Sequence, residues 1–488
     1  MKKNFIKDAV QYLPAHIIPL VFVFISVPVF TRIFSPIEYG NYSLIMSMVM
    51  ILNSLLDWLP QSVVRYYPIF DKNKSLNAFF GNIICLLFAS ILILIVIICS
   101  IAVFFRPFVS TQSYHLFYFG LGVFASWSIF NVFLQILRSQ RRIGWYCFFS
   151  IWKSAISFAL GLIIVLSLNF GINGILLGSI LTIIIILPFM WKKAFAGTRI
   201  VYSKIDITLL KNMMLYSYPL IIASISAWIL NLSDRYIIKF YHGSRDVGIY
   251  SASYDISRNS ILLFINMFML ALGPLSMNIW ENEGRDKSAH FINGVTSYYL
   301  LICIPAVTGL AALSHLIMFV LTGDKYIEGH RIFPIIALGI FFFGLQQIYN
   351  YGFLFHKVTR FISLGVMLSS CLNILLNFVF IPKYSYLAAS ITTMASYGFL
   401  LFLAVIFSRR YFTWTFPWKV FFKALLSSCV MMIFLINVPI NTCSWKLFDL
   451  IASIGIGFTV YTITLLILRE SNASDALLLI RLKIKQLS

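Results

Sequence analysis

Charged residues are scarce in this sequence. Asp, Glu, Lys and Arg make up only 11% of its 488 residues, whereas soluble domains contain roughly 25%. The composition therefore lies well outside the class of soluble globular domains. The shortage is greatest for acidic residues, which number 16 against 37 Lys and Arg. The resulting net charge is +21, and the positions of the basic residues along the chain indicate its role.

Motifs for catalysis, nucleotide hydrolysis and metal binding are also missing. There is no Walker loop and no HExxH motif, and none of the seven cysteines forms a CxxC pair. The segment Gly120-Leu-Gly122-Val-Phe-Ala125 resembles a dinucleotide fingerprint, but it lies inside an apolar stretch with no preceding strand. We therefore expect no enzyme activity, no cofactor and no metal site.

Long apolar runs fill the chain instead. Hydrophobic residues account for 60% of the sequence, and runs of about 18 or more are long enough to cross a hydrocarbon core of about 30 Å. The runs are continuous rather than alternating, so they predict helices and not barrel strands. We expect an all-α integral membrane protein of about fourteen transmembrane helices. Their approximate ranges are 9–33, 39–63, 76–105, 114–138, 144–168, 171–191, 212–240, 246–272, 291–321, 332–355, 360–381, 385–408, 418–438 and 446–468.

The positive charge gathers mainly in alternate short loops, as the positive-inside rule predicts. This placement argues against a nucleic-acid-binding protein, because no soluble basic domain is left to hold nucleic acid. It predicts a multi-pass protein of a bacterial or archaeal cytoplasmic membrane with both termini in the cytoplasm. The predicted parts are an N-terminal six-helix lobe, an inter-lobe loop, a C-terminal six-helix lobe, helices 13 and 14, and a basic amphipathic tail. They span residues 1–195, 196–211, 212–408, 409–470 and 471–488.

The two halves of the chain repeat weakly. Glu38-Tyr-Gly40-Asn-Tyr42 corresponds to Asp246-Val-Gly248-Ile-Tyr250 at an offset of 208 residues. Six helices per repeat is an even number, so the two lobes would run parallel about an axis along the membrane normal. Many transporters are built in this way and bind their substrate between the repeats.

Charged residues within the predicted helices are candidates for function. Each costs roughly 2.5–3.5 kcal/mol near mid-membrane, so such residues usually face a bundle interior or a watery cavity. A cavity containing Lys153 and Arg258 would hold a polyanion, and Asp57 or Asp255 could exchange a proton or bind a cation. Asp234 and Arg235 are two further candidates. The alternative, particularly for these two, is a structural role in which charged side chains pair locally and fix contacts between helices.

Three segments resemble polysaccharide-unit flippases. They are Thr31 to Ser43, Ser233 to Tyr254, and Asn373 to Ala389, which contains Asn377, Pro382 and Tyr384. The resemblance extends from about residue 10 to residue 408. It is to the Wzx-like flippases for O-antigen, capsule or exopolysaccharide, a branch of the multidrug/oligosaccharidyl-lipid/polysaccharide (MOP) exporter superfamily, which also holds the MATE drug exporters. One departure is Ser385, where the family usually has glycine.

The resemblance implies translocation of a polyprenyl-diphosphate-linked oligosaccharide to the outer leaflet. Two lobes would alternate access to a central cationic cavity, with helices 13 and 14 forming a groove for the lipid tail. It adds Arg32 and Arg65 to Lys153 and Arg258 as candidate ligands of the head group, although snorkelling to the interface is the alternative for the two arginines. The implied partners are the lipid-linked oligosaccharide, the bilayer, and the glycan polymerase and chain-length machinery.

The sequence leaves two alternative functions. A MATE-type cation-coupled drug exporter would usually need an acidic site in the N-terminal lobe, and Asp57 is the only deep acid there. A membrane-bound glycan polymerase or ligase would generally carry a long external loop with catalytic residues, whereas the external connections here are short. The flippase is preferred on both counts.

Overall fold

The computed structural model describes residues 2–104, 111–201, 207–437 and 446–469, and within these ranges every regular element is helical. The predicted all-α class is therefore confirmed. The predicted tail, residues 471–488, lies outside the described residues. The helices of the first half are α1 (Lys2–Ile33), α2 (Pro36–Leu56), α3 (Trp58–Lys72), α4 (Leu76–Phe104), α5 (Thr111–Ser139), α6 (Ile143–Leu168), α7 (Asn173–Ala194) and α8 (Ile207–His242).

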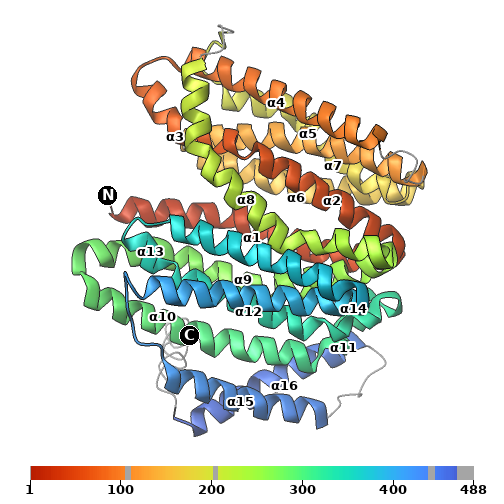
Figure 1. The fold of residues 1–488 in the computed structure, drawn as a ribbon, viewed down its shortest axis with the longest axis vertical. Coiled ribbons are helices and arrows are strands. Elements are labelled where there is room, and N and C mark those ends of the chain that lie inside the picture. The colour runs from red at the N-terminus through yellow and green to blue at the C-terminus, as the bar shows by residue number, and fades with distance from the viewer. Residues whose placement is uncertain (1, 105–110, 202–206, 438–445, 470–488) are drawn as a thin grey trace, which may run out of the picture. The chain divides into compact units, whose positions relative to one another are not determined.

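The second half continues the helical pattern (Figure 1). Its described residues include a 3₁₀ helix, Asp324–Arg331, besides the α-helices. The α-helices are α9 (Ser244–Glu283), α10 (Arg285–Ala312), α11 (Ser314–Thr322), α12 (Phe333–Tyr349), α13 (Tyr351–Phe355), α14 (Arg360–Ser408), α15 (Trp418–Asn437) and α16 (Lys446–Ile467).

Twelve stretches among the described residues are long and apolar enough to cross a membrane. Two features account for the difference from the fourteen predicted helices. The α14 stretch contains both of the predicted helices 360–381 and 385–408, and its backbone is non-helical at Ser385 between them. Helix α9 covers the predicted helix 246–272 but is not among the twelve. The protein is thus a multi-pass membrane protein.

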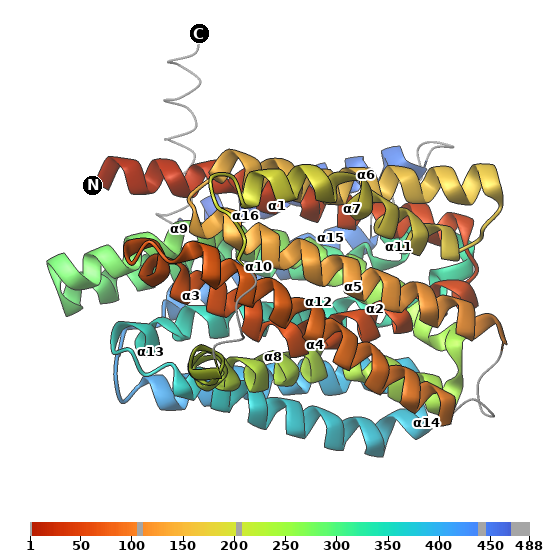
Figure 2. The same ribbon diagram turned by 90° about the horizontal axis from the view of Figure 1, so that it is seen from above.

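Two compact units make up the chain, residues 1–248 and residues 249–488. In the first unit, α6 packs against α1 and α7, and Figure 2 shows these three helices side by side. Helix α8 packs along α2 and α3. In the second unit, α12 packs against α10 and α14, and α10 packs against α15. The division into two six-helix lobes stays a prediction.

The predicted helix 39–63 is interrupted at Asp57, which lies between α2 and α3. Pro60 explains the interruption, because proline has no N–H to donate to the carbonyl of Leu56 four residues earlier. The backbone N–H of Asp57 instead donates to the carbonyl of Ser54 at 3.4 Å. An acidic side chain is thereby placed at a helix break inside a membrane-spanning stretch.

Glycines allow two close helix crossings in the first unit. A Cβ atom on Gly40 would lie 2.0 Å from the carbonyl oxygen of Ser244, and one on Gly248 would lie 1.9 Å from the carbonyl oxygen of Pro36. The contact is reciprocal, and both glycines belong to the repeat at offset 208. At the other crossing, a Cβ on Gly178 of α7 would lie 2.4 Å from the backbone nitrogen of Gly161 on α6, so these two helices pack closely there.

Candidate functional site in the first unit

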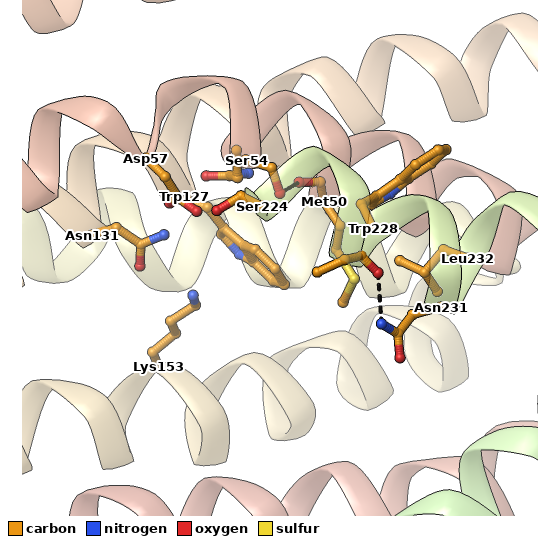
Figure 3. A pocket seen from close by; sticks show the side chains of 12 residues that line it. Met50, Ser54, Asp57, Trp127, Asn131, Lys153, Ser224, Trp228, Asn231 and Leu232 are labelled. Atoms are coloured by element: carbon orange, nitrogen blue, oxygen red, sulfur yellow. Dashed lines mark hydrogen bonds between the residues drawn. The ribbon is translucent and has the colours of Figure 1, made fainter. Parts of the chain in front are cut away.

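A cavity of about 460 Å³ lies among the membrane-spanning helices of the first unit (Figure 3). Helices α2, α5, α6 and α8 and the break at Asp57 supply its wall. Its lining combines a carboxylate, an ammonium, amides and hydroxyls with two indole rings. The lining residues are Met50, Asn53, Ser54, Asp57, Trp127, Asn131, Lys153, Ser224, Ala227, Trp228, Asn231 and Leu232.

Lys153 projects from the middle of α6 into this cavity. Its ammonium nitrogen lies 3.9 Å from the centroid of the Trp127 ring and 5.2 Å from that of Phe130. The negative faces of aromatic rings attract a cation at such distances. Within the described part of the chain, no carboxylate forms an ion pair with Lys153. Aromatic rings therefore lie beside this ammonium, but they do not neutralise its charge.

Asp57 lines the same cavity from the break between α2 and α3. Ser224, on α8, lines the cavity beside it (Figure 3). The fold thus brings together the two sequence candidates Asp57 and Lys153, which are far apart along the chain, without pairing them. Asp57 and Lys153 are the two ionisable residues among the described residues that line the cavity.

Hydrogen bonds hold both indole rings of the cavity in place. The Trp127 indole N–H donates to the hydroxyl of Ser179 at 3.0 Å, and that of Trp228 donates to the backbone carbonyl of Ser47 at 2.8 Å. Buried indoles usually need such a partner for their single polar atom. Because their N–H groups are already occupied, the rings offer only their π systems to a ligand.

The amides that line the cavity differ in how they are bonded. The side-chain nitrogen of Asn53 donates to the carbonyl of Val49 at 2.9 Å, and its oxygen accepts from Ser128 at 3.3 Å. The nitrogen of Asn231 donates to the carbonyl of Ala227 at 2.6 Å. In contrast, the side-chain amide of Asn131 has no hydrogen-bond partner among the described residues. Its donors and its acceptor are available to a ligand.

Arg32 and Arg65 are both exposed. Arg32 is in the last turn of α1. The Arg65 guanidinium carbon, on α3, lies 5.8 Å from the centroid of the Tyr216 ring. Neither arginine lines the cavity. Their role as head-group ligands stays a prediction.

Asp234 and Arg235 are buried on α8, with only 1% and 5% of their surfaces exposed. The Arg235 guanidinium donates to the Ser43 hydroxyl on α2 at 2.7 Å, and the Arg235 backbone N–H donates to the Asp234 carboxylate at 2.8 Å. These contacts support the structural alternative, in which the two residues help to fix α8 against α2. They do not test a role in ion coupling.

The remaining candidates, Asp255 and Arg258, lie on α9 in the second unit. Both side chains are half-buried. Among the described residues of the chain, no group of three His, Cys, Asp or Glu side chains could hold a metal ion.

Trp127, Asn131, Ser224 and Trp228 were not predicted from the sequence. Trp127 and Asn131 are spaced at i and i+4 on α5, so they share one face of that helix. This spacing is a signal that sequence reasoning could have used. Trp228 and Ser224 are also four residues apart, on α8, but nothing in the sequence places that helix face beside Lys153.

The fold and the cavity together define the class of protein: a multi-pass, all-α membrane protein with a polar, cation-bearing cavity among its spanning helices. Solved structures share this fold. A structure described as lipid II flippase MurJ in an inward closed conformation superposes with a TM-score of 0.74 at 17% identity, covering 93% of this chain and 98% of that one. An inward-facing MATE family transporter of the MOP superfamily gives 0.65 at 13% identity, covering 82% and 97%.

Sequence comparison identifies the family. The family described as polysaccharide biosynthesis protein matches residues 5–280, which is more than half of the chain. The chain therefore belongs to this family. It is also 23% identical over 219 residues to an uncharacterized membrane protein of Methanocaldococcus jannaschii, a match that covers 44% of this chain and 42% of that protein. The matched region thus spans less than half of that relative.

Proposed function

We propose that this protein translocates a polyprenyl-diphosphate-linked oligosaccharide across the cytoplasmic membrane by alternating access, in the synthesis of a surface polysaccharide. Membership of a polysaccharide biosynthesis family supports the pathway. The fold that the chain shares with a lipid II flippase supports transport of a lipid-linked substrate. The activity proposed is transport and not catalysis, and the glycan polymerase and chain-length machinery are the proposed partners.

The observation that carries this proposal is the Lys153 ammonium, which faces a polar cavity between membrane-spanning helices and forms no ion pair within the described residues. Placing an uncompensated charge in a membrane interior costs roughly several kcal/mol of free energy. A chain gains from such a residue when the substrate supplies the missing negative charge. An anionic sugar of the substrate would do so, because hydrogen bonds between charged groups are stronger than those between neutral groups.

Complementation tests the proposal. The chain is expressed in cells that lack their own flippase and carry one of several defined glycan loci, and surface glycan is measured. Restored glycan with at least one locus is the expected result. Accumulation of lipid-linked precursor on the inner leaflet with every locus, despite normal membrane insertion of the chain, would overturn the proposal.

A MATE-type drug exporter is the second candidate, favoured by the MATE fold and by Asp57 in the cavity. The ammonium of Lys153 in the same cavity argues against it, because like charges repel a cationic drug where water is excluded. Accumulation of a lipophilic cationic dye distinguishes the two functions. A drug exporter would lower dye accumulation in cells that express the chain, whereas the proposed flippase leaves it unchanged.

A further inference from the structure

The composition of the cavity wall in the first unit indicates which part of the substrate it receives. Its ionisable side chains, within the described lining, are one lysine and one aspartate. A diphosphate only accepts hydrogen bonds and carries about two negative charges, so it is best bound by several cationic donors. The Asp57 carboxylate would repel it, and so would the negative faces of the two indole rings. The wall is poorly suited to a diphosphate.

The same wall suits a sugar ring. Sugar hydroxyls donate and accept hydrogen bonds, and the cavity offers an acceptor in Asp57, a donor in Lys153 and both in Asn131. The C–H faces of a sugar ring are apolar and slightly positive, so they pack favourably on the negative face of an indole. A volume of about 460 Å³ is within the size range of small-ligand sites.

We propose that the cavity lined by Asp57, Trp127, Asn131, Lys153 and Trp228 is a glycan subsite, which binds a sugar ring of the transported oligosaccharide while the diphosphate binds elsewhere. This inference rests on the proposed function and assigns one part of its substrate to one site. Asn131 and Lys153, which have no hydrogen-bond or ion-pair partner within the described residues, bind the polar groups of the sugar. Trp228, locked by its bond to Ser47, provides an apolar surface for the ring.

The variants Trp228→Ala and Trp228→Phe separate stacking from structure. Both lose the hydrogen bond to the Ser47 carbonyl, but only Trp228→Phe keeps an aromatic ring. A purely structural role for that bond would therefore affect both variants equally. Asn131→Ala removes the free amide without disturbing any hydrogen bond of the described residues. Trp418→Ala is the matched control, because Trp418 is 60% exposed on α15 in the second unit.

The binding test uses the purified full chain in lipid nanodiscs and saturation-transfer difference NMR. The probes are glucose, galactose, N-acetylglucosamine and glucuronate, with inorganic pyrophosphate as competitor. We expect ring C–H signals from at least one sugar with the wild type, Trp228→Phe and Trp418→Ala. We expect these signals to fall about fivefold in Trp228→Ala and in Asn131→Ala. Equal signals in the wild type and Trp228→Ala for every sugar, or displacement of the sugar by pyrophosphate, would overturn the subsite.

The complementation assay keeps this inference separate from the proposed function. If the wild type restores no surface glycan with any locus, the proposed function fails. If the wild type restores it, and Trp228→Ala and Asn131→Ala restore it equally well, transport stands and the glycan subsite is wrong. Loss of export in Trp228→Ala and Asn131→Ala, with retention in Trp228→Phe, supports the subsite.

Discussion

At the scale of single residues, Lys153 combines a charge in the membrane interior with aromatic packing against Trp127. We expect Lys153→Ala to lower glycan export at least about tenfold, because the charge that compensates the substrate is lost. Lys153→Arg keeps the charge and the attraction to the ring, so it should retain part of the activity. Arg258→Ala should lower export to a similar extent if Arg258 binds the head group. Surface glycan is measured at equal levels of inserted protein.

Lys287→Ala is the control for these variants, because Lys287 is exposed and pairs with Glu283 on the surface at 3.2 Å. It should export normally. Unchanged surface glycan in both Lys153→Ala and Arg258→Ala would remove these two residues from the site.

Ser385 carries backbone strain. Its φ of 48° and ψ of −134° interrupt α14, and a side chain is disfavoured in this region of backbone space. Ser385→Gly should therefore stabilise the protein by about 1 kcal/mol, seen as a higher temperature of thermal unfolding in detergent. Ser363→Gly, within the helical part of α14, should instead lower the unfolding temperature, because glycine weakens a regular helix. A lower unfolding temperature for Ser385→Gly would contradict this account.

At the scale of helices, the contact between α2 and the start of α9 depends on two glycines. A Cβ on Gly40 or Gly248 would lie about 2 Å from a backbone oxygen, a distance that requires the helices to move apart. We expect Gly40→Ala and Gly248→Ala each to lower the free energy of unfolding by about 1–3 kcal/mol and to lower the yield of folded protein. Size-exclusion chromatography and thermal unfolding measure this effect.

Gly294→Ala is the matched control for the crossing. It replaces a helical glycine in α10 whose Cβ would meet nothing within 4 Å, so it should be neutral or slightly stabilising. If all three variants behave alike, the close crossing does not limit stability.

At the scale of the whole molecule, transport must be coupled to an energy source, and Asp57 is the candidate in the cavity. It lies at a helix break and lines the cavity together with Ser224 of α8. If Asp57 exchanges the coupling ion, Asp57→Asn should transport slowly and should no longer respond when the proton or sodium gradient is collapsed. Wild-type export should fall under the same treatment. Export into vesicles with imposed gradients measures both, and an Asp57→Asn variant that still responds would exclude Asp57 as the coupling site.

Much of the fold could be predicted because the bilayer restricts what a chain can do. Continuous apolar runs must form helices in lipid, so the all-α class follows from composition and run length. The merged stretch at α14 and the interruption at Asp57 both lie near prolines, Pro382 and Pro60, whose effect on helices is local. Short-range chemistry of this kind can be inferred from a sequence.

The site could be predicted only in part. Lys153 and Asp57 stood out by themselves, since a charge in an apolar helix is rare and costly wherever the helix packs. Their shared cavity could not be foreseen, because it depends on which faces of α2, α5, α6 and α8 meet. Trp228 and Asn131 are ordinary residues in an isolated helix, and they become candidates only beside Lys153. The sequence by itself therefore determined the membrane-spanning class and the isolated charges. Tertiary packing decided which side chains share a cavity, because contacts between distant helices depend on shape complementarity and not on local composition.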